Sequence, residues 1–220
     1  VEVRKVPLAD NFGLDAGGIM AAVDGNTKMV FVCSPNNPTA NLMDRDAVAG
    51  LCTDLSGRVL VVVDETYIDY SDADSMATEL ERFENLVVLR TLSKSHAAAG
   101  LRCGVTVARA DVTELLQKVL APYPVPQPVV KAALAILTPA NQARLAARRE
   151  EIIARRDAFA EQALATGPVK KILPTDANYL LMIVDDADAL CARAADQGYI
   201  LRNQSHQPGL LGAIRVSIGT

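Results

Sequence analysis

The stretch V-L-V-V-V-D-E-T-Y, residues 59–67, joins five consecutive apolar residues directly to a polar turn. Apolar residues that continue without alternation are typical of a strand buried on both faces, as in a parallel sheet covered by helices. Two further runs have this character, Met29–Cys33 and Leu86–Leu89. Together they predict an α/β fold with a mostly parallel sheet flanked by helices.

Helices and a further strand are expected around these runs. Asp44 is suited to cap a helix that continues to about Leu55 and closes at Gly57. A strand is predicted at Gly104–Arg109 and a helix at Asp111–Leu120. This order of elements favours an α/β architecture with right-handed crossovers.

A proline-rich stretch, residues 122–128, interrupts the pattern and is followed by a helical segment. A long helix is predicted from about Asn141 to Ala165. In it Leu145, Ile152 and Phe159 recur every seven residues among charged ones, so we expect this stripe to pack against the protein.

The residues after Gly167 predict a smaller α+β unit. Its expected elements are strands at Val169–Leu173, Tyr179–Val184, Tyr199–Arg202 and Ala213–Ile218, and a helix near Ala187–Gln197. We therefore expect part of a large domain over residues 1–138, a connecting helix over 139–166 and an incomplete small C-terminal domain over 167–220.

Composition excludes several classes of partner. The 220 residues are 50% hydrophobic, and 22 basic against 26 acidic residues give a net charge of −4 without a basic run, which disfavours nucleic acid and anionic membranes. The apolar runs are far shorter than the roughly 20 residues of a membrane helix. No secretory signal is visible, the four cysteines form no C-x-x-C pair, and two histidines make a metal cluster unconvincing. We expect a cytoplasmic, reduced protein without a metal.

Each of the three buried strands leads into an unusual polar loop. The loops are Ser34–Ala40, Asp64–Tyr67 and Thr91–Lys94. In open α/β sheets, ligands bind beyond the carboxyl ends of parallel strands. The three loops are therefore predicted to meet at one site.

Each polar residue taken alone also has an ordinary explanation. Asp64 could be a strand-end turn acid and Asn37 a turn former. Tyr67 could simply pack its ring, Lys94 could lie on the surface, and Arg102 could form a salt bridge. Their shared placement after buried strands is what favours a common site.

A lysine, an opposed aspartate and a cup of anion donors together indicate pyridoxal phosphate chemistry. Lys94 can form a Schiff base with the cofactor aldehyde. Asp64 can keep the pyridine nitrogen protonated, which makes the ring a better electron sink. Thr91, Ser93 and Arg102 flank the lysine and can donate to the cofactor phosphate. The sequence has no G-x-G-x-x-G motif or P-loop that would favour a nucleotide.

Four motifs resemble the successive signatures of the class I/II aminotransferases of fold type I. They are S-P-N-N-P-T at 34–39, V-V-V-D-E-T-Y at 61–67, T-L-S-K at 91–94 and A-G-L-R-C-G at 99–104. Within that family, stretches 7–12, 121–124, 200–205, 207–208 and 214–220 are most similar to the histidinol-phosphate aminotransferases. The resemblance covers essentially the whole chain.

The resemblance implies a role for each motif residue. Lys94 is the Schiff-base lysine and Asp64 the partner of the pyridine nitrogen. Asn37 and Tyr67 are expected to hydrogen-bond the ring hydroxyl oxygen, with Tyr67 also among the catalytic residues. The expected phosphate ligands are Thr91, Ser93 and Arg102.

Two arginines of the smaller unit are candidates for substrate binding. In the predicted strand Ala213–Ile218, Arg215 points away from the face that Ile214 and Val216 share. A guanidinium suits a carboxylate or a phosphate, and by resemblance Arg215 binds a substrate anion. Arg202 is the second such arginine, suited to a phosphorylated substrate. The alternative is two ordinary surface arginines.

The function implied by the resemblance is amino transfer from L-histidinol phosphate to 2-oxoglutarate in histidine biosynthesis, by a homodimer when full length. Alternatives are an aromatic amino-acid aminotransferase, a phosphothreonine decarboxylase of the same fold, or a cofactor-binding sensor domain of a transcription regulator.

The chain also departs from the family pattern. Ala40 stands where the family usually has glycine, and His96 stands where an aromatic is common and is expected to be a packing replacement. Family members are longer, so the chain is expected to be a fragment that opens inside the large domain. It would lack a backbone loop for the cofactor phosphate, an aromatic that stacks on the ring and a tyrosine given to the partner subunit.

Overall fold

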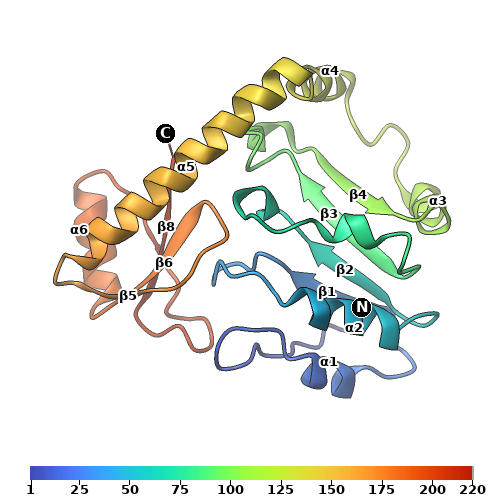
Figure 1. Cartoon of the computed structure of the whole chain (residues 1–220), viewed down its shortest axis with the longest axis horizontal. Coiled ribbons are helices and arrows are strands. Elements are labelled where there is room, and N and C mark those ends of the chain that lie inside the picture. The colour runs from blue at the N-terminus through green and yellow to red at the C-terminus, as the bar shows by residue number, and fades with distance from the viewer. Residues whose placement is uncertain (220) are drawn as a thin grey trace.

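The computed structural model describes residues 1–219 and contains, within that range, two four-stranded sheets joined by a long helix (Figure 1). The first sheet has the strand order β1-β2-β3-β4. Its strands are β1 (Met29–Cys33), β2 (Leu60–Asp64), β3 (Leu86–Thr91) and β4 (Gly104–Ala108).

Strands β1, β2 and β3 are parallel, whereas β4 is antiparallel to β3. The parallel strands are the continuous apolar runs, and Val61, Val63 and Val88 of β2 and β3 are buried. The mostly parallel sheet predicted from these runs is therefore present. In the outermost strand β1, however, Met29 and Phe31 are 53% and 66% exposed, so the burial on both faces expected for Met29–Cys33 was wrong. Because the three strands share one direction, the loops that follow them leave the same edge of the sheet.

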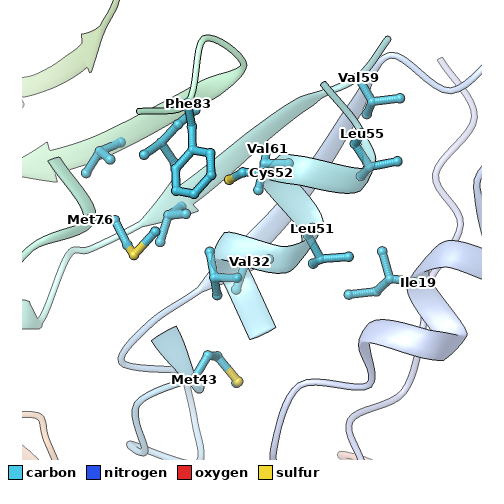
Figure 2. Close-up of a cluster of buried hydrophobic side chains, with 14 residues drawn as sticks. Ile19, Val32, Met43, Leu51, Cys52, Leu55, Val59, Val61, Met76 and Phe83 are labelled. Atoms are coloured by element: carbon cyan, nitrogen blue, oxygen red, sulfur yellow. The ribbon is translucent and has the colours of Figure 1, made fainter. Parts of the chain in front are cut away.

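One face of the first sheet is covered by α1 (Ala16–Ala22) and α2 (Arg45–Asp54), which enclose the largest buried cluster (Figure 2). Asp44 caps α2 by accepting a hydrogen bond from the backbone N–H of Ala47, as its sequence position predicts. Leu51 and Cys52 of α2 pack toward the strands. Helix α1 was not expected from the sequence.

The opposite face is covered only in part by α3 (Ala110–Val119), whose Val112 packs on Val62 and Val87. The proline-rich stretch then leads to α4 (Gln127–Ile136). Three short 3-10 helices complete this half of the chain: η1 (Ile68–Tyr70), η2 (Met76–Glu79) and η3 (Ala99–Leu101).

The connecting helix α5 (Pro139–Leu164) crosses from α4 to the second sheet as one continuous rod (Figure 1). Leu145 and Ile152 are buried as predicted, but Phe159 is 40% exposed, so its place in the packing stripe was wrong. A seven-residue repeat drifts by about 20° per heptad around a straight helix. The buried positions after Ile152 are instead Arg156 and Ala163.

The second sheet has the order β5-β6-β8-β7 and is antiparallel throughout, with α6 (Ala187–Asp196) packed on it. Its strands are β5 (Val169–Ile172), β6 (Tyr179–Val184), β7 (Arg202–Asn203) and β8 (Ala213–Ser217). The strand expected at 199–202 is the one displaced element, since Tyr199 and Ile200 lie exposed outside β7. The proposed division at residues 138 and 166 stays a prediction, and Thr220 lies outside the described residues.

Candidate active site

The loop after β2 fixes the carboxylate of Asp64 at the edge of the first sheet. Asp64 pairs with Cys33 of β1 and Leu89 of β3. Its Oδ1 accepts hydrogen bonds from the backbone N–H of Thr66 at 2.9 Å and from Thr66 Oγ1 at 2.6 Å. Burial and the nearby Asp64 charge raise the pKa of the Cys33 thiol to about 11, so the thiol stays protonated at neutral pH.

Lys94 lies against an aromatic pair that joins the two sheets. Its Nζ is 5.4 Å from the centroid of the Tyr67 ring, within the range of a cation–π contact. Tyr67 in turn meets Tyr179 of β6 edge to face, with ring centroids 5.2 Å apart. The hydroxyl of Tyr179 donates to the carbonyl of Asn36 at 2.7 Å. Burial raises the pKa of Tyr179, which keeps that hydroxyl a donor.

The loop after β1 reaches the second sheet through Asn37. Nη1 of Arg215 donates to Oδ1 of Asn37 at 2.9 Å, and the Arg215 guanidinium lies 5.0 Å from the Tyr179 ring centroid. The structure therefore brings Tyr67 and Arg215 against Tyr179, with Asn37 bonded to Arg215 and Lys94 beside Tyr67.

Arg202 of β7 lies directly opposite Arg215 of β8 in the antiparallel register. Like charges in directly opposed positions are destabilising unless something offsets them. Nε of Arg215 is buried and has no hydrogen-bond partner within residues 1–219. Both arginines line a cavity of about 470 Å³ whose other lining residues are Asn37, Pro38, Asn203, Gln204, His206 and Gln207. Without an acid in this lining, the cavity is suited to an anion.

The three predicted phosphate ligands are only partly assembled. Thr91 Oγ1 donates to Ser93 Oγ at 2.9 Å and accepts from the backbone N–H of Ser93 at 3.1 Å. The backbone next to Arg102 lies beside this pair, because the carbonyl of Cys103 accepts a hydrogen bond from the backbone N–H of Leu92 at 3.1 Å. The exposed Arg102 guanidinium donates to the carbonyl of Ala99 at 3.0 Å rather than to this pair.

Sequence reasoning missed the central place of Tyr179 and the contribution of residues 203–207 to the cavity. Tyr179 opens an otherwise apolar strand, which by itself indicates packing and gives no signal for its hydrogen bond to a loop 143 residues away. The loop 203–207 was noted only as a family resemblance.

The departure at position 40 has a structural explanation. Ala40 is fully buried with φ of 67°, in the left-handed region that glycine adopts without cost. Its backbone N–H donates to the carbonyl of Asn36, and its own carbonyl accepts from the backbone N–H of Asp176, both at 2.8 Å. These two bonds hold the loop in the conformation that the usual glycine would favour.

His96 is half-buried beside Ser95, with Nδ1 3.0 Å from Ser95 Oγ. Burial lowers the pKa of His96, and the charges of Arg149 and Arg90 act in the same direction against that of Asp69. The folded protein therefore disfavours the charged imidazolium.

His96 should make stability depend on pH. An unfolded histidine has a pKa of about 6.5, so below that pH the unfolded chain binds more protons than the folded one. The free energy of unfolding is then expected to fall as pH drops from about 6.5 through the lower folded pKa. His96→Phe should lose this part of the dependence, as measured by urea unfolding at about pH 7.5 and about pH 5.5. An equal loss of stability on acidification in both proteins would contradict the assignment.

Within residues 1–219, no helix combines the length and apolar character needed to cross a membrane. In the same described range, no group of three or more His, Cys, Asp or Glu side chains is arranged to hold a metal ion.

Polar loops at the end of an α/β sheet, one of them with Lys94, meet a second sheet whose two arginines line a cavity suited to an anion. This arrangement defines a candidate cofactor-dependent enzyme. The sequence matches the family described as aminotransferase class I and II over residues 1–220. The chain therefore belongs to the class I and II aminotransferase family.

Named relatives agree with this family. Histidinol-phosphate aminotransferase 2 of Idiomarina loihiensis is 42% identical over 225 residues, which cover 100% of this chain and 62% of the relative. The crystal structure of histidinol-phosphate aminotransferase from Sinorhizobium meliloti in complex with pyridoxal-5'-phosphate matches with a TM-score of 0.86 and 27% identity, over 99% of this chain and 60% of that one. The predicted fold type I architecture is confirmed. The chain spans about three fifths of the length of these relatives.

Proposed function

We propose that the protein containing this chain transfers the amino group of L-histidinol phosphate to 2-oxoglutarate, giving imidazole acetol phosphate and glutamate in histidine biosynthesis. The observation that carries the proposal is the opposed pair Arg202 and Arg215 at a cavity that Asn37 also lines. The names of the relatives, at 40–42% identity over the whole chain, support the same substrate.

The residues present fit pyridoxal phosphate as the cofactor. Lys94 supplies an amine for its aldehyde, and the fixed carboxylate of Asp64 is suited to a protonated pyridine nitrogen. Thr91, Ser93 and Arg102 offer hydroxyl and guanidinium donors for its phosphate. When bound, this cofactor supplies an electron sink that stabilises negative charge at the substrate Cα.

The proton transfer is assigned to Lys94. Its Nζ would take the proton from the substrate Cα and return it at C4′ of the cofactor, as a general base and then a general acid. The Tyr67 ring, 5.4 Å from that nitrogen, limits where the amine can lie. Asp64 would hold the proton on the pyridine nitrogen, while Asn37 and Tyr67 would bond the ring hydroxyl oxygen.

One cavity must accept two kinds of anion. Histidinol phosphate carries a phosphate and lacks an α-carboxylate, whereas glutamate carries two carboxylates. Arg215 is held by Asn37 and Tyr179 at the inner part of the site, so we assign it to both substrates. Arg202 is exposed at the edge of the sheet, and we assign it to the phosphorylated substrate.

Arginine substitutions in the complete protein test this assignment. Arg215→Ala should lower kcat/KM for both half-reactions, and Arg202→Ala should lower it more for histidinol phosphate than for phenylalanine. Losing a charge-assisted hydrogen bond costs about 1.5–3 kcal/mol. This corresponds to a roughly ten- to hundredfold loss in kcat/KM. Arg193→Ala is the matched control, because Arg193 lies on α6, outside the cavity.

Equal losses for histidinol phosphate and phenylalanine in Arg202→Ala would argue against Arg202 as the phosphate ligand. An aromatic amino-acid aminotransferase would then become the better proposal.

We also propose that the complete protein acts as a cytoplasmic homodimer on small-molecule substrates. The net charge of −4 without a basic run supports a partner set that excludes nucleic acid and anionic membranes. Size-exclusion chromatography with light scattering would test the dimer.

A further inference from the structure

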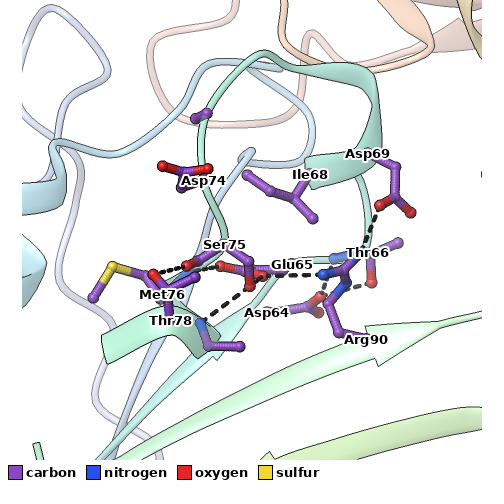
Figure 3. A network of polar contacts seen from close by, with 12 residues as sticks. Asp64, Glu65, Thr66, Ile68, Asp69, Asp74, Ser75, Met76, Thr78 and Arg90 are labelled. Atoms are coloured by element: carbon purple, nitrogen blue, oxygen red, sulfur yellow. Dashed lines mark hydrogen bonds and ion pairs between the residues drawn. The ribbon is translucent and has the colours of Figure 1, made fainter. Parts of the chain in front are cut away.

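The carboxylate of Asp69 bridges two donors that lie far from it in the sequence. Asp69 belongs to the 3-10 helix η1, two residues after Tyr67. Its Oδ1 accepts from Nη2 of Arg90 at 2.5 Å, and its Oδ2 accepts from Oγ of Ser95. Figure 3 shows Arg90 between Asp69 and Glu65.

These two donors flank the stretch Thr91–Lys94, which we call the lysine segment. Arg90 immediately precedes Thr91, and Ser95 immediately follows Lys94. One carboxylate therefore holds both ends of the segment that contains Lys94. We propose that Asp69 is a positioning residue that sets the place of the Lys94 amine through Arg90 and Ser95. This inference rests on the proposed function of Lys94.

The bridge is anchored in buried surroundings. Ser95 is 5% exposed and Glu65 is 2% exposed. Nη1 of Arg90 is 3.7 Å from Oε2 of Glu65, which is itself fixed by the Ser75 hydroxyl at 2.5 Å and the Met76 N–H at 2.6 Å (Figure 3). Charge-assisted bonds are stronger in such partly desolvated networks than at the surface. The Arg90 guanidinium is therefore held between Glu65 and Asp69, so its position is fixed on both sides.

The Ser95 hydroxyl also lies against His96. Ser95 has a single hydroxyl hydrogen, which it donates to Asp69. Its oxygen can therefore accept a hydrogen bond from Nδ1 of His96, 3.0 Å away, when that nitrogen carries the proton. Burial lowers the pKa of His96, which disfavours a charged imidazolium beside the bridge.

The bridge also sets Lys94 relative to Tyr67, because both depend on one turn. Tyr67 is the residue that precedes η1, and its ring lies 5.4 Å from the Lys94 amine. With Asp69 two residues further on, the turn that presents the ring also holds the lysine segment. Without the bridge, the amine could move while the ring stays in place. Misplacement of a reacting group by about 1 Å can cost roughly a hundredfold in rate.

The test follows covalent attachment of pyridoxal phosphate to the cofactor-free complete protein, by absorbance and by borohydride trapping with peptide mapping. Ser95→Ala should slow attachment at Lys94 about tenfold. Asp69→Asn should slow it about ten- to a hundredfold, because the amide keeps only one of the two acceptor oxygens and loses the charge that holds Arg90. Ser95→Thr, which keeps a hydroxyl, should restore most of the rate. In the loaded enzyme, kcat should fall while KM for histidinol phosphate changes by no more than about twofold.

Ser71→Ala is the matched control, because its hydroxyl donates to the carbonyl of Ile68 in the same turn, away from the lysine segment. Melting temperatures identify a variant that is merely unfolded. Unchanged attachment rates in folded Ser95→Ala and Asp69→Asn would overturn the positioning role alone. Absence of attachment at Lys94 in the unsubstituted protein would instead overturn the proposed function, and the positioning role with it.

Discussion

Lys94→Ala in the complete protein is expected to abolish the absorbance of lysine-bound cofactor and nearly all transamination. The alanine removes both the amine that attaches the aldehyde and the group assigned to move the proton at Cα. A loss of at least about a thousandfold in turnover is expected, since two functions depend on one nitrogen. Stopped-flow assays with histidinol phosphate, together with absorbance spectra, measure both effects.

Borohydride trapping separates this result from simple unfolding. Trapping in the unsubstituted protein should label Lys94, and peptide mapping identifies the labelled residue. Lys118→Ala, on the outer helix α3, is the matched control and should retain full activity. Labelling of a different lysine would end the assignment of Lys94.

Asp64→Asn is expected to bind the cofactor but to lower turnover by roughly a hundredfold or more, because a neutral amide cannot stabilise the positive charge on the pyridine nitrogen. The amide oxygen can still accept both hydrogen bonds from Thr66, so the loop should keep its conformation. Cofactor titration and kcat measured on the same preparation check the two expectations.

Asp72→Asn is a suitable control, because Asp72 is an exposed aspartate that follows η1, outside the loop that contains Asp64. It should leave both cofactor affinity and kcat unchanged. Near-normal turnover in Asp64→Asn would remove Asp64 from the mechanism.

The strands could be predicted from sequence wherever burial alone decides the pattern. Tyr179–Val184 has the predicted bounds, because nearly all its side chains are buried. Met29–Cys33 also has the predicted bounds, although Met29 and Phe31 are exposed and burial does not explain these bounds. Phe159 was misplaced because a strict seven-residue repeat drifts by about 20° per heptad, so the drift has doubled by the second heptad after Leu145. The two-residue strand β7 is held by its pairing with β8, which no local pattern reveals.

The candidate site was predictable to the extent that strand ends define it. Because β1, β2 and β3 are parallel, Asn37, Asp64 and Lys94 all follow the carboxyl ends of strands on the same side of the sheet. This placement does not depend on side-chain contacts. The contacts through Tyr179 and Asp69 were not predictable, because each joins segments that only the folded chain brings together. Such contacts depend on the packing of whole elements, whereas motifs report short stretches.

The two walls of the cavity differ in how well they can tolerate mutation. Its inner wall contains Asn37 and Arg215, which also join the two sheets, so a change there disturbs the fold together with the chemistry. The outer wall is the loop of residues 203–207, and Asn203, Gln204, His206 and Gln207 of that loop line the cavity without being buried. Under the proposed function, changes at Gln204, His206 and Gln207 are expected to alter substrate choice at little cost in stability. Asn203 is the exception, because its side chain donates to Asp188 and accepts from the backbone N–H of Ser205.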